Sequence, residues 1–226
     1  KRMDTRGTEP GQAALRSTAL EHGVWDVNHE YYSNMAGVDG DHWFHLEAWV
    51  DASMQSDSAN QPMFHADLDP RLPLAPGADE PSVFTLTGTA HDPRRRDPDN
   101  NVLDPSKVPH ELRLTLGTKT ISHTWNIDFT KRSIVNWTQV ISSTVRTEDL
   151  EVRLVAGQQS NGVLFDKIHW QQPVSLDFQG KGAAFSGVAG VWQYHLTDLP
   201  SGAALYDVTD PANPTLLHVL EQPEDL

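Results

Sequence analysis

The sequence predicts an all-β chain, a jelly-roll-like antiparallel β-sandwich with a small C-terminal β appendage. Three observations predict it. Short runs rich in β-branched and aromatic residues recur along the chain, apolar and polar residues alternate within the clearest runs, and clusters of Pro, Gly, Asp and Asn separate them. A chain of 226 residues with this pattern suits one large β domain or two small ones.

Alternation is clearest in residues 112–116 and 150–154. In the first run the leucines share one face, and Arg113 and Thr115 share the other. Strands with one apolar and one polar face are typical of antiparallel sheets packed as a sandwich. The predicted strands are residues 41–50, 82–89, 111–116, 120–127, 134–142, 150–155, 163–171, 191–196, 203–207 and 215–220.

The chain divides into three predicted parts. Residues 1–23 are expected to form a loosely ordered N-terminal segment, with a short helix around residues 12–20. Residues 24–175 are expected to form the sandwich, and residues 176–226 a small β appendage or linker toward a missing downstream domain, because the pattern changes near Pro173. Two long connections, residues 55–80 and 91–109, are dense in turn-forming residues, and such loops are typically functional or partly disordered.

Charge and composition exclude several classes of function. The formal net charge of -14 opposes attraction to phosphate backbones and anionic lipids, so neither nucleic acid nor a membrane surface is an expected partner. No run approaches the ~20 apolar residues of a membrane span, so no membrane insertion is expected. The chain has no cysteine, which excludes disulfides, thiolate zinc sites and thiol catalysis.

No catalytic residues are predicted, and we expect the chain not to be an enzyme. The Gly-x-Ser-x-Gly motif of serine hydrolases is absent. A stand-alone hydrolase would need a pocket with converging carboxylates or histidines, which is a property of the fold. His42, His45 and Glu47 have the residue types of a metal site, but on a strand His42 would face away from the other two.

An acidic loop is the candidate metal site. Its sequence places Asp97, Asp99 and Asn101 at the first, third and fifth positions, followed by Asp104. Calcium loops begin in this way, but valine replaces both the glycine of the sixth position and the glutamate of the twelfth. The alternative is a solvated acidic loop, so no cofactor is expected unless this loop binds calcium.

The tryptophans suggest a second class of function. Exposed tryptophans in a row would form a sugar-stacking platform, whereas core packing is the usual role of aromatic side chains. The seven are Trp25, Trp43, Trp49, Trp125, Trp137, Trp170 and Trp192.

Residues 196–217 contain a strand, the turn Asp-Val-Thr-Asp-Pro-x-x-Pro and a second strand. The prolines fix φ, and Asp207 and Asp210 can bond the backbone two residues on, so the turn is expected to be rigid. Together with earlier segments in order, this region resembles the β-sandwich that precedes the peptidase domain of gingipain-like cysteine peptidases, a family that includes the sortase of the type IX secretion system. The earlier segments are residues 29–33, 41–44, 82–86, 110–117 with Trp125, and 163–170, in which Asp166 stands at a characteristic position.

The resemblance implies a non-catalytic accessory or interaction domain of an exported bacterial peptidase, secreted or at the cell surface. Its expected partner is a downstream catalytic domain, in the same polypeptide or in another protein. The family's nucleophilic cysteine has no counterpart in this chain. The alternative function is a carbohydrate-binding module, with a glycan as ligand and calcium as a stabilising ion.

Overall fold

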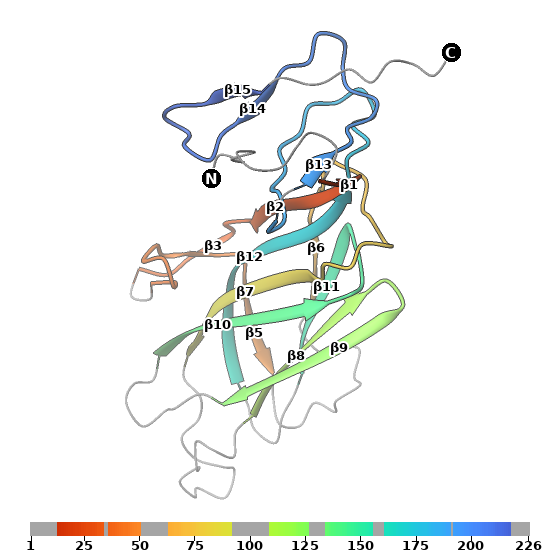
Figure 1. Cartoon of the computed structure of the whole chain (residues 1–226). Helices are drawn as coiled ribbons and strands as arrows, with labels where there is room; N and C mark the ends of the chain where they lie inside the picture. The colour runs from red at the N-terminus through yellow and green to blue at the C-terminus, as the bar shows by residue number, and fades with distance from the viewer. Residues whose placement is uncertain are drawn as a thin grey trace, which may run out of the picture.

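The computed structural model describes residues 13–33, 36–50, 63–91, 109–126, 134–155, 161–190 and 192–217. The regular secondary structure of these residues consists of β-strands, which confirms the predicted all-β class. Within these ranges the structure has no helix that is long and apolar enough to cross a membrane. Two sheets form the body of the molecule, and smaller strand pairs lie outside it (Figure 1).

The first sheet is built around one long strand, β12 (Asn161–Ser175). One edge of β12 pairs antiparallel with β7 (Ser82–His91), which pairs in turn with β10 (Ile134–Ser143). The other edge is shared, because β5 (Leu46–Val50) pairs with the first part of β12 and β2 (Thr18–Asp26) with the second. The chain between β2 and β5 therefore leaves the sheet beside the middle of β12.

The second sheet is antiparallel and has the order β6-β11-β8-β9. These strands are β6 (Met63–Asp67), β11 (Asp149–Val155), β8 (Pro109–Leu116) and β9 (Lys119–Asn126). A two-residue turn joins β8 to β9, and its first residue, Gly117, has φ 59°. A glycine with positive φ at this position is typical of the type II′ hairpin turn, whose twist matches that of the flanking strands.

The core lies between the two sheets. Phe84 and Leu86 of β7 pack in one cluster with Leu114 of β8 and Val152 of β11, and all four are buried. The predicted alternation is confirmed, because the leucines of residues 112–116 are buried and the residues between them are partly exposed. The apolar inner faces of two antiparallel sheets therefore make the predicted β-sandwich.

Two buried tryptophans of the core lie against glycines of neighbouring strands. Trp137 of β10 is the Cα partner of Gly88 on β7, and Trp170 of β12 is the Cα partner of Gly23 on β2. Both tryptophans are 5% exposed. The missing side chain of each glycine leaves the space into which the indole ring packs.

The remaining strands form three small pairs. β14 (Leu205–Asp207) and β15 (Thr215–Leu217) make an antiparallel hairpin. β1 and β13 pair in parallel, and β3 and β4 pair antiparallel. Their bounds are β1 (Ala14–Arg16), β13 (Trp192–Tyr194), β3 (Glu30–Tyr31) and β4 (Trp43–Phe44).

Each predicted strand coincides with at least one observed strand, but the helix predicted around residues 12–20 is wrong. Its described residues lie in β1 and β2, because the edges of β13 and β12 offer backbone partners that outweigh the helix propensity of the alanines. The predicted connection over residues 55–80 contains β6, which was also missed. The division at residues 23 and 175 stays a prediction; β2 spans the first of these positions and β12 ends at the second.

Candidate functional site

A β-bulge in the middle of β12 forms the base of the candidate site. The register of β12 against β7 shifts between Phe165 and Ile168. At this point two residues of β12, Asp166 and Lys167, lie opposite one residue of β7, Thr87. The extra residue also changes which side chains face the core. Phe165 and Ile168 both belong to the core, whereas an unbroken strand would place them on opposite faces.

The segment between β2 and β5 covers the outer face of the first sheet at this bulge. We call its described residues, 27–33 and 36–45, the β3–β4 flap. Phe44 of the flap and Leu164 of β12 are fully buried against each other, with Tyr32 packed beside them. The backbone N–H of His45 donates to the Phe165 carbonyl at 2.7 Å, so the flap is attached to β12 by both packing and a hydrogen bond.

A tight turn of the flap, residues 37–41, lies directly over the bulge. The Gly37 N–H donates to the Asp41 carbonyl at 2.7 Å, and the Asp41 N–H donates to Asp39 Oδ1 at 3.1 Å. Asn136 of β10 holds the turn from the sheet side, because its Nδ2 donates to the Gly37 carbonyl at 2.9 Å. A Cβ atom on Gly37 would lie only 3.2 Å from Asp166 Oδ2, so the turn is packed against the aspartate of the bulge.

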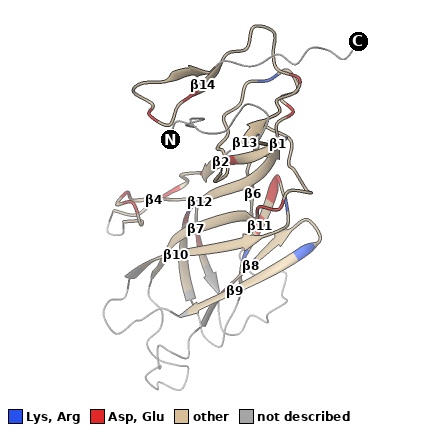
Figure 2. Ribbon diagram, in the orientation of Figure 1, with Lys and Arg blue, Asp and Glu red and all other residues tan. Residues whose placement is uncertain are grey.

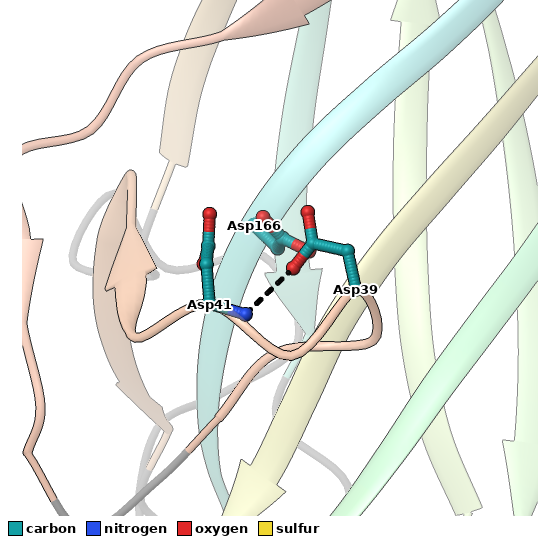
Figure 3. Close-up of side chains that lie close together, drawn as sticks. All are labelled: Asp39, Asp41 and Asp166. Atoms are coloured by element: carbon teal, nitrogen blue, oxygen red, sulfur yellow. Dashed lines mark hydrogen bonds between the residues drawn. The ribbon is translucent and has the colours of Figure 1, made fainter.

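Three carboxylates meet between the turn and the bulge. Asp39, Asp41 and Asp166 each offer one oxygen, and these oxygens lie within 4.8 Å of one another. Asp39 and Asp166 point toward each other from opposite sides of the site, with Asp41 beside them (Figure 3). Figure 2 shows the flap as one of the segments where acidic residues gather. Carboxylate oxygens in this arrangement suit a hard cation.

Asp166 is the most deeply buried member of this group, at 1% exposure. Its Oδ2 accepts a hydrogen bond from Thr87 Oγ1 at 3.2 Å. Its Oδ1 is buried and has no hydrogen-bond partner, and Lys167 Nζ lies 4.0 Å from it. Burial raises the pKa of Asp166 to about 6, an effect that Lys167 opposes and that the charge of Asp39 reinforces.

Lys167 is the counter-charge of the site. Its ammonium group donates a hydrogen bond to Asp39 Oδ2 and lies 3.8 Å from the carboxylate of Asp26. The hydrogen bond from Lys167 lowers the pKa of Asp39. Burial alone would lower the pKa of Lys167, but Asp39 and the neighbouring carboxylates raise it above its usual value. The ammonium and at least one carboxylate are therefore held in their charged forms.

The predicted calcium loop lies outside the described residues, so a calcium site at Asp97, Asp99, Asn101 and Asp104 stays a prediction.

His42, His45 and Glu47, for which no metal site was expected, have separate partners. His42 Nδ1 lies 2.8 Å from the Tyr32 carbonyl, and Glu47 accepts a hydrogen bond from the Tyr32 hydroxyl. His45 packs against Trp25, with ring centroids 4.5 Å apart.

The described tryptophan side chains do not form an exposed row. Trp137 and Trp170 are buried, and Trp25 and Trp125 are partly buried against the core. Trp43 is 43% exposed and lies beside Tyr31, which is 57% exposed, with ring centroids 5.1 Å apart. The side chain of Trp49 is outside the described part, and Trp192 is partly buried, with the guanidinium carbon of Arg16 5.1 Å from the centroid of its ring.

The carboxylate group of Asp39, Asp41 and Asp166 was not predicted from the sequence. The sequence held one signal of this site. The charged pair Asp166-Lys167 interrupts an apolar run, and such a pair is unusual in a strand that is covered on both faces. The partners of Asp166 lie more than 120 residues earlier, and no local pattern connects them with it.

The chain was compared with protein families, curated proteins and solved structures. No protein-family model matches the chain, and no curated protein matches it significantly. The chain is similar to the crystal structure of dimeric latent PorU from Porphyromonas gingivalis, with 11% sequence identity and a TM-score of 0.47. The match covers 79% of this chain and 15% of that chain. A likeness at this level does not identify the family or the function of the chain.

Proposed function

We propose that the chain is a non-catalytic accessory domain of an exported, gingipain-like peptidase, and that it packs against a catalytic domain through the β14–β15 hairpin. The ordered motifs of the sequence support the family, and the lack of cysteine supports a non-catalytic role. The observation that carries the proposal is the exposed apolar face of this hairpin, which lies in the segment with the most informative of those motifs.

The hairpin exposes three apolar side chains. Tyr206 and Leu216 are Cα partners on adjacent strands, so their side chains project from the same face. Val208 directly follows the end of β14 and adds a third exposed apolar side chain to the hairpin. Tyr206 is 52% exposed, Leu216 53% and Val208 55%. An isolated two-stranded hairpin is marginally stable in water, so a partner that covers this face would stabilise it.

The hairpin is suited to a contact because its turn is held by its own side chains. Asp207 Oδ1 accepts a hydrogen bond from the Thr209 N–H at 2.9 Å, and Asp210 Oδ1 accepts one from the Ala212 N–H at 3.1 Å. Both bonds confirm the prediction for this turn. The hairpin lies apart from the two large sheets (Figure 1), so its exposed face is not covered by the sandwich.

Hydrogen exchange tests the proposal. The amides of residues 205–217 are compared in the isolated chain and in the protein encoded by the full open reading frame. We expect slower exchange in the longer protein, because the catalytic domain would cover the hairpin. The turn at residues 117–118 serves as the control and should exchange equally in both. Equal exchange at residues 205–217, or thiol-dependent peptidase activity of the isolated chain, would contradict the proposal.

A second candidate function is glycan binding through the flap. Tyr31 and Trp43 form an exposed aromatic pair, the kind of surface on which sugar rings stack. The test is a glycan-array and affinity-gel screen of the chain and of its Trp43→Ala variant, with Tyr206→Ala as a variant that changes an exposed aromatic elsewhere. Binding that is lost only in Trp43→Ala would favour this function, and the absence of binding in the unmodified chain would remove it.

A further inference from the structure

The strongest unassigned feature of the described chain is the carboxylate group between the flap and the bulge. We propose that Asp39, Asp41 and Asp166 bind a calcium ion, which fastens the β3–β4 flap to the first sheet. This inference is independent of the accessory role, and the site differs from the acidic loop at residues 97–104.

Asp166 has a buried carboxylate oxygen without a hydrogen-bond partner. The residue is 1% exposed, and no hydrogen-bond donor of the described residues lies against its Oδ1. A buried carboxylate oxygen without a partner is costly, and an ion at this position would be its ligand partner. Thr87 already satisfies Oδ2 and orients the carboxylate across the site.

The three carboxylate oxygens are close enough together to share one ion. Calcium binds oxygen ligands at about 2.3–2.6 Å, so two ligands on opposite sides of one ion lie about 5 Å apart. The oxygens of Asp39, Asp41 and Asp166 lie within 4.8 Å of one another, close enough for this span. One ion can therefore contact all three carboxylates, and water would complete its coordination.

The chemical type of the ligands favours calcium. The three donors are carboxylate oxygens, which suit calcium and magnesium and not the softer metals that prefer nitrogen or sulfur. Calcium tolerates irregular geometry, whereas magnesium demands a near-ideal octahedron. Ligands supplied by a turn and by the bulge of a separate strand favour calcium.

The charge of this region also favours a bound cation. The carboxylates of Asp26, Asp39, Asp41 and Asp166 share this region with the ammonium group of Lys167, so negative charge is in excess. Lys167 pairs with Asp39, and calcium would compete with it there. Because Asp26 also lies near Lys167, the ammonium has a second partner to which it can turn when the ion binds.

Calorimetric titration with calcium chloride, after treatment with a chelator, tests the site on the full chain. Asp166→Asn and Asp41→Asn each remove one charged ligand and should weaken binding about tenfold or more, or abolish it. Lys167→Met removes the competing ammonium and should strengthen binding. If Lys167 had only a structural role, its replacement would not strengthen calcium binding.

Two control variants separate this site from other acidic residues. The double variant Asp97→Asn/Asp99→Asn alters the acidic loop, and Asp198→Asn makes the same chemical change at an exposed residue elsewhere; both should keep the binding of the unmodified chain. Calcium should also raise the melting temperature and slow amide exchange at residues 37–41, and both effects should be lost in Asp41→Asn.

Several results would overturn the proposal. They are no heat of binding at millimolar calcium, unchanged affinity in both Asp41→Asn and Asp166→Asn, or loss of binding in the acidic-loop double variant alone. Magnesium chloride is the second titrant, and magnesium binding as tight as calcium binding would overturn the assignment of the ion.

Discussion

The indole ring of Trp137 occupies the space that a Cβ atom on Gly88 would need. Such an atom would lie 2.5 Å from Trp137 Cζ2 and 2.5 Å from the Leu164 carbonyl oxygen, and the second contact is with backbone that cannot rotate away. Gly88 therefore joins three adjacent strands of the first sheet, because its lack of a side chain lets β10 and β12 pack closely on β7.

Replacing Gly88 with alanine should destabilise the sandwich. Overpacking a well-packed core costs about 1–3 kcal/mol, and Gly88→Ala should reach the upper part of that range since one clash involves backbone. The control is Gly77→Ala, because a Cβ atom on Gly77 meets nothing within 4 Å and its φ is not positive. Urea unfolding measures both variants, and equal midpoints would contradict the role of Gly88.

Phe44 and Trp43 are adjacent on β4, and truncating them should change the free energy of unfolding by very different amounts. Phe44 is fully buried against Leu164, so Phe44→Ala should lower the free energy of unfolding by about 3–5 kcal/mol. Trp43 is 43% exposed, so Trp43→Ala should change it by about 0.5 kcal/mol or less. Chemical unfolding gives both values. If the two costs were alike, the flap would not be packed on β12 as described.

Glu21 should be required for the attachment of residues 71–72 to β2. Its side chain is 5% exposed, and its two carboxylate oxygens accept hydrogen bonds from the N–H groups of Arg71 and Leu72, at 2.9 and 3.0 Å. Glu21→Gln replaces one acceptor with a donor and should cost about 1–3 kcal/mol, the penalty for a buried group that loses its partner. Glu148→Gln, at an exposed position, should be nearly neutral. A neutral Glu21→Gln in urea unfolding would contradict this attachment.

His45 should contribute stability that is lost in mild acid. Burial lowers the pKa of His45 below its usual 6.5, and the nearby His29 adds to the effect. The unfolded chain therefore binds a proton more readily than the folded chain. The contribution is fully present above about pH 6.5, falls as the pH drops below that value, and levels off below the folded pKa.

Unfolding in urea at several pH values between 5 and 8 checks this dependence. His45→Phe keeps an aromatic ring against Trp25 and Phe64 but cannot be protonated. The variant should show a shallower loss of stability between pH 7 and pH 5 than the unmodified chain. An unchanged slope would mean that His45 is not responsible.

The sequence was sufficient where structure depends on neighbours in the chain. Alternation in residues 112–116 and 150–154 predicted strands with one buried face, since side chains of a strand alternate whatever the partner strand is. The turn at Asp207 and Asp210 was equally local, because each side chain bonds a backbone N–H two residues away. The all-β class and the sandwich follow from repeated patterns of this kind.

The tertiary structure decided the rest. Residues 14–26 became strands and not a helix because the edges of β13 and β12 satisfied their backbone groups. Asp166 meets Asp39 and Asp41 only because a flap folds back over the outer face of the sheet at the bulge of β12. Pairing and burial of residues far apart in the chain leave no periodic signal, so the sequence by itself determined the kind of fold and the tertiary structure determined the candidate site.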